Sequence, residues 1–230
     1  LIWNSDIFQG LKEYSEEIKT YNNIKLPSHS PAGLFTGYSI DRENNERVIN
    51  LSEETVEEWL EFLQKTSLQR YGIEYIKIEF GFEGSPTIFN PYETNRLGLR
   101  GYKVEKYFLL GIKALVDEIH QKGLKAAWQS RTFLYVKGGS QDEDERTREI
   151  YKRAVEEWGF DYLMLDFNYT DLTNSCWERS AMDLIHHRFE VIREAVGDDI
   201  FIEACMVPFG PIMGVADGFR PSSDFRAGLD

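Results

Sequence analysis

The sequence predicts an α/β protein of the (β/α)8 TIM-barrel class, incomplete in this chain, with about six βα units. Short apolar runs alternate with helical patterns at intervals of roughly 40 residues, as βα units of a parallel sheet do. Long segments follow the apolar runs, and long βα loops favour a barrel because they build its active site. The competing fold, a doubly wound sheet, is disfavoured because its Gly-x-Gly-x-x-Gly motif is absent.

The first half of the chain predicts a lead-in followed by the first barrel elements. Residues 1–32 are expected to be an N-terminal lead-in or linker, and residues 33–230 the barrel domain, lacking its last strands. Leu34 to Tyr38 forms the first apolar run. Ser52 is expected to cap a helix, because two glutamates and then apolar residues at helical spacing follow it. The β-branched run Ile73 to Ile78 predicts the second strand.

The middle of the chain continues the alternation of helix and strand. Apolar residues at helical spacing predict a helix from about Ile112 to Ile119, and Gly123 stands where a glycine commonly follows a helix. Leu124 to Trp128 predicts the third strand. The charged stretch Gln141 to Arg148 begins the next helix, which is expected to end before Gly159.

The last part of the chain predicts three more strands. The run after Gly159 predicts a buried fourth strand that ends on a carboxylate, Asp166. A helix from about Trp177 is expected to end at Gly197. Ile200 to Cys205 predicts the fifth strand, and residues 215–219 a short sixth.

Composition excludes several functional classes. The chain has 230 residues and a formal net charge of −13, and an acidic surface of this kind repels nucleic acid. No apolar run approaches the ~18–20 residues of a membrane span. Two cysteines cannot build a disulfide framework, and no Cys/His cluster has zinc-site spacing. No signal peptide is visible, which slightly favours a cytoplasmic location.

Carboxylates recur where the predicted strands end. Glu79, Asp166, Glu203 and Asp224 all stand there, at the end of a barrel that carries the chemistry. A single Asp at such a place is usually a cap or turn residue, so the recurrence is what points to function. Two opposed carboxylates suit glycoside hydrolysis, in which one attacks the anomeric carbon and the other protonates the leaving oxygen.

Three segments resemble retaining α-galactosidases of glycoside hydrolase families 36 and 27. The strand "DYLMLDF" resembles their Tyr-Leu-Lys-x-Asp strand. The segment Ile192 to Asp224 is similar to family 36 over its whole length, including a Cys-containing turn and an Asp four residues after an Arg. Gly111 to Trp128 resembles the third βα unit of the family. Together the resemblance extends from Phe35 to Asp224.

The resemblance implies a role for each matching residue. Asp166 would be the nucleophile and Asp224 the acid/base. Arg220 would hydrogen-bond the sugar near O2, Cys205 would line the pocket, and Trp128 would form an apolar wall. It implies two steps through a covalent glycosyl-enzyme, an oligosaccharide or glycoside as substrate, and no metal or organic cofactor.

Two departures from the family pattern concern sugar recognition. The lysine expected two residues before the nucleophile is Met164, and the expected Asp-Asp-Gly-Trp is Glu79-Phe80-Gly81-Phe82. A buried sugar hydroxyl without a partner costs about 1–3 kcal/mol, so these departures leave open which sugar is bound. Glu79 could still bind a hydroxyl, and Lys77 or Arg131 could replace the missing lysine.

Two other functions remain open from the sequence. A catalytically silent carbohydrate-binding relative would explain Met164 and Phe80. A magnesium-dependent barrel lyase or racemase would use Glu79, Asp166 and Glu203 as ligands, although no Lys or His base stands at a strand end. In each case the open edges of an incomplete barrel would be covered by a second copy or by more of the same chain.

Overall fold

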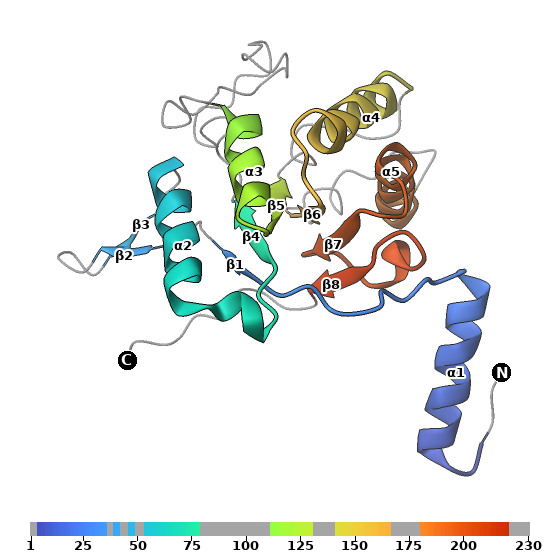
Figure 1. Ribbon diagram of the computed structural model, residues 1–230. Helices are drawn as coiled ribbons and strands as arrows, with labels where there is room; N and C mark the ends of the chain where they lie inside the picture. The colour runs from blue at the N-terminus through green and yellow to red at the C-terminus, as the bar shows by residue number, and fades with distance from the viewer. Residues whose placement is uncertain are drawn as a thin grey trace.

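The computed structural model describes residues 4–35, 39–41, 46–48, 53–78, 111–130, 141–166 and 180–220. Six strands form one parallel sheet in the order β1-β4-β5-β6-β7-β8, and the sheet curls into part of a barrel (Figure 1). The strands are β1 (Gly33–Phe35), β4 (Tyr75–Ile78), β5 (Lys125–Ser130), β6 (Tyr162–Leu165), β7 (Phe201–Cys205) and β8 (Gly218–Arg220). The predicted fold class and its six barrel strands are therefore confirmed.

Four helices cover the outer face of this sheet. They are α2 (Glu53–Thr66), α3 (Ile112–Gln121), α4 (Gln141–Glu156) and α5 (Ala181–Val196), with short 3-10 turns η1 (Leu68–Tyr71) and η4 (Gly210–Ile212). Helix α5 begins later than the predicted start near Trp177, because Ser180 and Asp183 cap it reciprocally. None of the helices in the described parts of the chain is long and apolar enough to cross a membrane.

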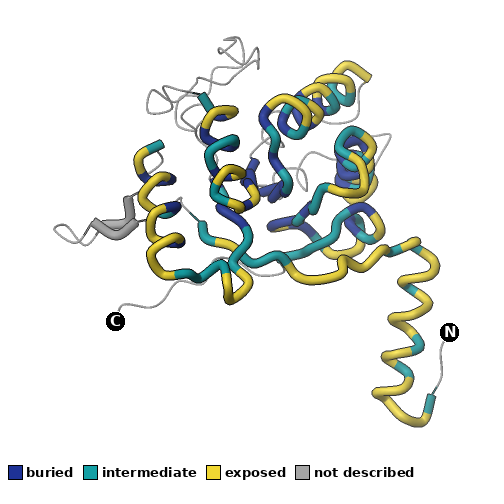
Figure 2. Tube along the Cα trace, in the orientation of Figure 1, coloured by how far each residue is buried: buried dark blue, intermediate teal, exposed yellow. Residues whose placement is uncertain are grey.

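One helix and one pair of strands were not predicted. Helix α1 (Ile7–Tyr21) lies within the expected lead-in, and Asp6 caps it by accepting hydrogen bonds from the backbone of Phe8 and Gln9. It has no buried residue and stands away from the sheet (Figures 1 and 2). Strands β2 (Ser39–Asp41) and β3 (Glu46–Val48) form a separate antiparallel pair.

The two faces of the sheet have different surroundings. Successive side chains of a strand point to opposite faces, so one set packs on the helices and the other lines the barrel. The main core joins strands to helices and includes Ile76, Trp128, Leu163, Leu165 and Ile202. A smaller cluster holds only strand residues: Tyr75, Ala127, Tyr162, Met164, Cys205 and partly buried Phe201. This second cluster marks the inner face.

Two aspartates fasten the N-terminal ends of the strands. One oxygen of Asp161 accepts hydrogen bonds from the backbone of Ala126, at 2.9 Å, and from His120. Asp217 repeats the arrangement, accepting from the backbone of Ile202 at 2.8 Å and from Arg193. Both carboxylates therefore have a structural role.

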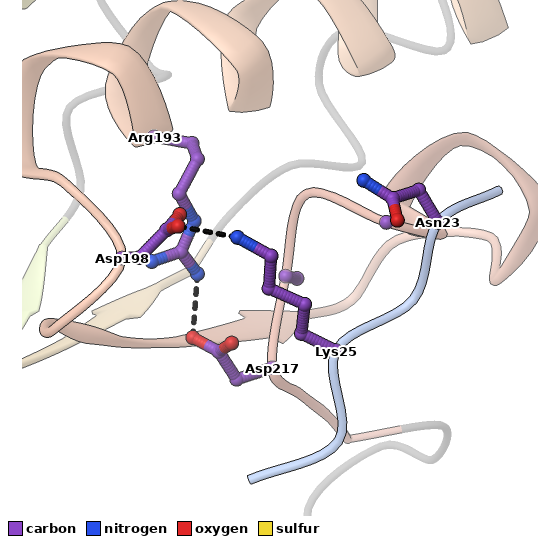
Figure 3. A pocket seen from close by; sticks show the side chains of 7 residues that line it. Asn23, Lys25, Arg193, Asp198 and Asp217 are labelled. Atoms are coloured by element: carbon purple, nitrogen blue, oxygen red, sulfur yellow. Dashed lines mark hydrogen bonds and ion pairs between the residues drawn. The ribbon is translucent and has the colours of Figure 1, made fainter. Parts of the chain in front are cut away.

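The segment after α1 runs past the same end of the barrel (Figure 3). Lys25 pairs with Asp198 beside the Arg193–Asp217 pair, and a cavity of about 190 Å³ lies between them. The four charged side chains that line the cavity all take part in these two ion pairs. It opens at the N-terminal ends of the strands, opposite the end where barrel chemistry is found.

Candidate active site at the carboxyl ends of the strands

Asp166 is a buried carboxylate at the end of a strand that is buried throughout. All four residues of β6 are buried, and Asp166 directly after it is 4% exposed. Its backbone N–H donates to the carbonyl of Ser130 on β5, at 3.0 Å, so it continues the parallel ladder by one residue. The ladder holds the backbone of Asp166 rigidly at the barrel mouth.

Gln129 on β5 binds this carboxylate directly. Its Nε2 donates to Asp166 Oδ2 at 2.6 Å, and Gln129 is itself 5% exposed. A buried charge needs hydrogen bonds, and the hydrogen bond from Gln129 to the Asp166 carboxylate is charge-assisted. Gln129 was not predicted as a site residue. The signal for it was its place directly after the apolar run Leu124 to Trp128, where a predicted strand ends.

Cys205 and Arg220 complete the group at three strand ends. Cys205 pairs in register with Arg220 across β7 and β8. Burial raises the pKa of the Cys205 thiol, a hydrogen bond to Asp166 and its negative charge raise it further, and Arg220 opposes them. The structure thus brings together Asp166, Cys205 and Arg220, which the sequence placed on three separate strands.

Trp128 lies on the other face of the sheet. It is 1% exposed and packs between the sheet and the helices, stacked on Phe160 with ring centroids 5.9 Å apart and close to Tyr151 and Trp158. Because side chains alternate along β5, its neighbour Gln129 takes the inward position. The structure therefore does not bring Trp128 to the site, and the expectation that it walls the sugar pocket lacks support.

Lys77 reaches the residue that departs from the family pattern. Its Nζ lies 3.0 Å from Met164 Sδ and 4.5 Å from the centroid of the Phe35 ring. Ala127 lies beside Lys77 in register on the intervening strand, and its small side chain leaves room for the lysine to cross. An ammonium from β4 thus lies against position 164 on β6.

A second pair of polar groups lies deeper in the barrel. The Tyr162 hydroxyl donates to the Glu203 carboxylate, and both line a cavity of about 240 Å³ together with Lys77 and Phe35. Burial raises the pKa of the Tyr162 hydroxyl, and the charge of Glu203 raises it further. The interior beneath Asp166 therefore combines an ammonium, a carboxylate and a phenol.

Three predicted site residues lie outside the described residues: Glu79, Arg131 and Asp224. Among the residues that are described, no group of three or more His, Cys, Asp or Glu side chains is placed to hold a metal ion.

The chain is similar in sequence to a curated plant protein. It is 29% identical over 160 residues to an α-galactosidase of rice (Oryza sativa subsp. japonica), across 67% of this chain and 34% of that protein. The chain thus spans about a third of the length of the curated relative that it matches. No family model matches the sequence.

Solved α-galactosidase structures share the fold. The Thermus thermophilus enzyme, in complex with stachyose, aligns over 89% of this chain and 47% of its own with a TM-score of 0.62 and 18% identity. α-Galactosidase I of Mortierella vinacea aligns over 84% of this chain and 45% of its own with a TM-score of 0.57 and 21% identity. The chain is therefore similar in sequence to an α-galactosidase, and it shares part of the barrel fold of the solved α-galactosidases.

Proposed function

We propose that the protein is a glycoside hydrolase that cleaves terminal α-linked sugars with retention, as α-galactosidases do. One observation carries the proposal: a buried carboxylate, Asp166, stands at the carboxyl end of a barrel strand and is bonded from both neighbouring strands. Carboxyl ends of strands are where barrel enzymes place their reacting groups. Similarity to the rice α-galactosidase supports the same reaction class.

Asp166 is the nucleophile in this mechanism. Its carboxylate attacks the anomeric carbon, the bond to the leaving oxygen breaks, and Asp224 gives that oxygen a proton. Water then hydrolyses the glycosyl-enzyme with Asp224 acting as base. Retention requires the two carboxyl groups to lie ~5–5.5 Å apart. Arg220 and Cys205, adjacent to Asp166 on the next two strands, border the same sugar.

Lys77 reads the sugar in place of the expected lysine at position 164. Its ammonium lies 3.0 Å from Met164 Sδ, and it can donate to a sugar hydroxyl as a lysine at position 164 would. Glu79 and Arg131 remain proposed contacts to the same sugar. The substrate is a glycoside or oligosaccharide with a terminal α-linked sugar; the Thermus enzyme was solved with stachyose.

The reacting pair is tested in the full-length protein. We expect Asp166→Ala and Asp224→Ala each to abolish cleavage of an aryl α-glycoside, because each removes a group that takes part in bond breaking. A 2-fluoro glycosyl fluoride should label Asp166 covalently, as read by peptide mass spectrometry. Asp142→Ala, at an exposed position of α4, is the matched control and should keep full activity. Turnover by Asp166→Ala would refute the proposal.

Met164 favours one competing function, a catalytically silent carbohydrate-binding protein. Such a relative would bind the same sugars, measured by calorimetry, without turnover and without covalent labelling. Labelling at Asp166 therefore separates the two functions directly.

A further inference from the structure

We propose that Gln129 is a positioning residue for the nucleophile, fixing the orientation of the Asp166 carboxylate. The inference rests on the proposed function, in which Asp166 attacks the sugar. Its own evidence is geometric: a side-chain hydrogen bond of 2.6 Å between two residues that are 5% and 4% exposed.

The strand register makes this bond possible. Gln129 pairs with Met164 on β6, so its inward side chain needs to reach only one inward position further along to meet Asp166. The hydrogen bond between Cys205 and Asp166 comes from β7, on the opposite side of β6. Donors on both neighbouring strands thus hold one carboxylate. A carboxylate offers about four lone-pair sites, which leaves room for attack.

Orientation is the property that these donors supply. The terminal torsion of an Asp side chain is broad, so backbone rigidity alone does not fix its oxygens. Nucleophilic attack needs the reacting atoms about 3–3.5 Å apart and aligned. An amide is suited to this role because it donates without titrating, so its hydrogen bond to the ionised carboxylate persists at every working pH.

The first test replaces the amide by a carboxyl group of the same shape. Gln129→Glu places two carboxyl groups at hydrogen-bond distance, and two such groups cannot both ionise easily. The acid limb of the pH profile of kcat/KM should move up by about one pH unit or more. Gln141→Glu makes the same change at an exposed position of α4 and should leave the profile unmoved.

The second test removes the donor and keeps the length of the side chain. Gln129→Met should slow covalent labelling of Asp166 by a 2-fluoro glycosyl fluoride roughly 10- to 100-fold, the loss expected for a hydrogen bond to a charge. The effect should fall on kcat, with KM for the substrate nearly unchanged. Both variants are first shown to be folded by circular dichroism.

Outcomes separate this inference from the function on which it rests. Loss of labelling in Asp166→Ala together with a wild-type pH profile in Gln129→Glu and a wild-type labelling rate in Gln129→Met would overturn the positioning role alone. Full turnover by Asp166→Ala would instead overturn the proposed function. If only one Gln129 variant folds, its single readout decides the inference.

Discussion

Asp166 is a charge in an apolar setting, and its immediate neighbours make it tenable. Leu165 before it is fully buried, yet the carboxylate meets an amide from Gln129 and a thiol from Cys205. Removing a charge from water is expensive unless hydrogen bonds replace the lost solvation. At the strand end where a nucleophile is proposed, the hydrogen bonds to Asp166 offset this loss of solvation. Asp161 and Asp217 accept their hydrogen bonds at the opposite end of the barrel.

At the same scale, the Lys77–Met164 contact predicts that a lysine at position 164 can take over the role of Lys77. Lys77→Met should lower kcat/KM roughly 10- to 100-fold, because the proposed donor to a sugar hydroxyl is lost. Adding Met164→Lys to that variant should recover most of the loss, since it puts the ammonium back at almost the same point from β6. Steady-state kinetics on an aryl α-glycoside measures both.

Lys125→Met is the control for this exchange. Lys125 begins β5 at the other end of the barrel, with its ammonium 5.3 Å from the Tyr75 ring centroid, and its loss should leave kcat/KM unchanged. Equal kcat/KM in Lys77→Met and the unmodified protein would show that Lys77 does not read the sugar.

At the scale of elements, Asp161 before β6 and Asp217 before β8 link neighbouring strands through hydrogen bonds. Each joins the start of its strand to the preceding one through a backbone N–H and a basic side chain. The Arg193 side chain also donates to the backbone carbonyls of Val215, Gly197 and Ile200. One guanidinium therefore ties α5 to β7 and β8.

We predict that Asp217→Ala lowers the free energy of unfolding by about 1–3 kcal/mol, because the Ile202 N–H and Arg193 lose their acceptor. Asp198→Ala removes a carboxylate of the same cavity whose pair with Lys25 is two-thirds exposed, and should cost only about 0–1 kcal/mol. Urea denaturation followed by circular dichroism measures both. Equal losses of unfolding free energy in the two variants would show that Asp217 does not stabilise the link between β7 and β8.

Most strands and helix ends could be predicted from the sequence, but the direction of individual side chains could not. Strands were predictable because each is a short apolar run between turn signals, and Gly123, Gly159 and Gly197 were predictable helix ends, all now found at positive φ. The sequence could not predict which side chains of β5 point into the barrel. Five of its six residues are buried, so no alternation of polarity separates Trp128 from Gln129. Asp224 and Glu79 stay predictions, since they lie outside the described residues.

Helix α1 was missed for a different physical reason. The other helices are recognised by an apolar face that packs on the barrel core, whereas α1 buries no residue. Its signals were nevertheless present: Asp6 as a cap, and apolar side chains such as Ile7, Leu11 and Tyr14 at helical spacing. Those side chains are more than half exposed.

For the whole molecule, the buried acids of the inner face predict how stability depends on pH. Burial raises the pKa of the Cys205 thiol above its ordinary 9.0 and that of the Tyr162 hydroxyl above 10.0. The folded state therefore favours their neutral forms. Their contribution to the free energy of unfolding is complete below about pH 9 and declines as pH rises, because only the unfolded chain ionises freely.

Equilibrium unfolding between pH 7 and about pH 11 tests this expectation. The free energy of unfolding should fall above pH 9, near the ordinary pKa of a thiol, and Cys205→Ala should reduce the slope because one ionising group is gone. An identical slope in the Cys205→Ala protein would show that the thiol does not contribute.

The hydrogen bond between Gln129 and Asp166 joins residues 37 positions apart in the sequence, and Cys205 and Arg220 come from strands still later in the chain. No contiguous peptide contains the site. Contacts of long sequence separation form late, because the chain must first close the intervening loops. Asp166, the proposed nucleophile, therefore gains its donors only when β5, β6 and β7 have paired, and local separation of these strands would remove the donors before the whole protein unfolds.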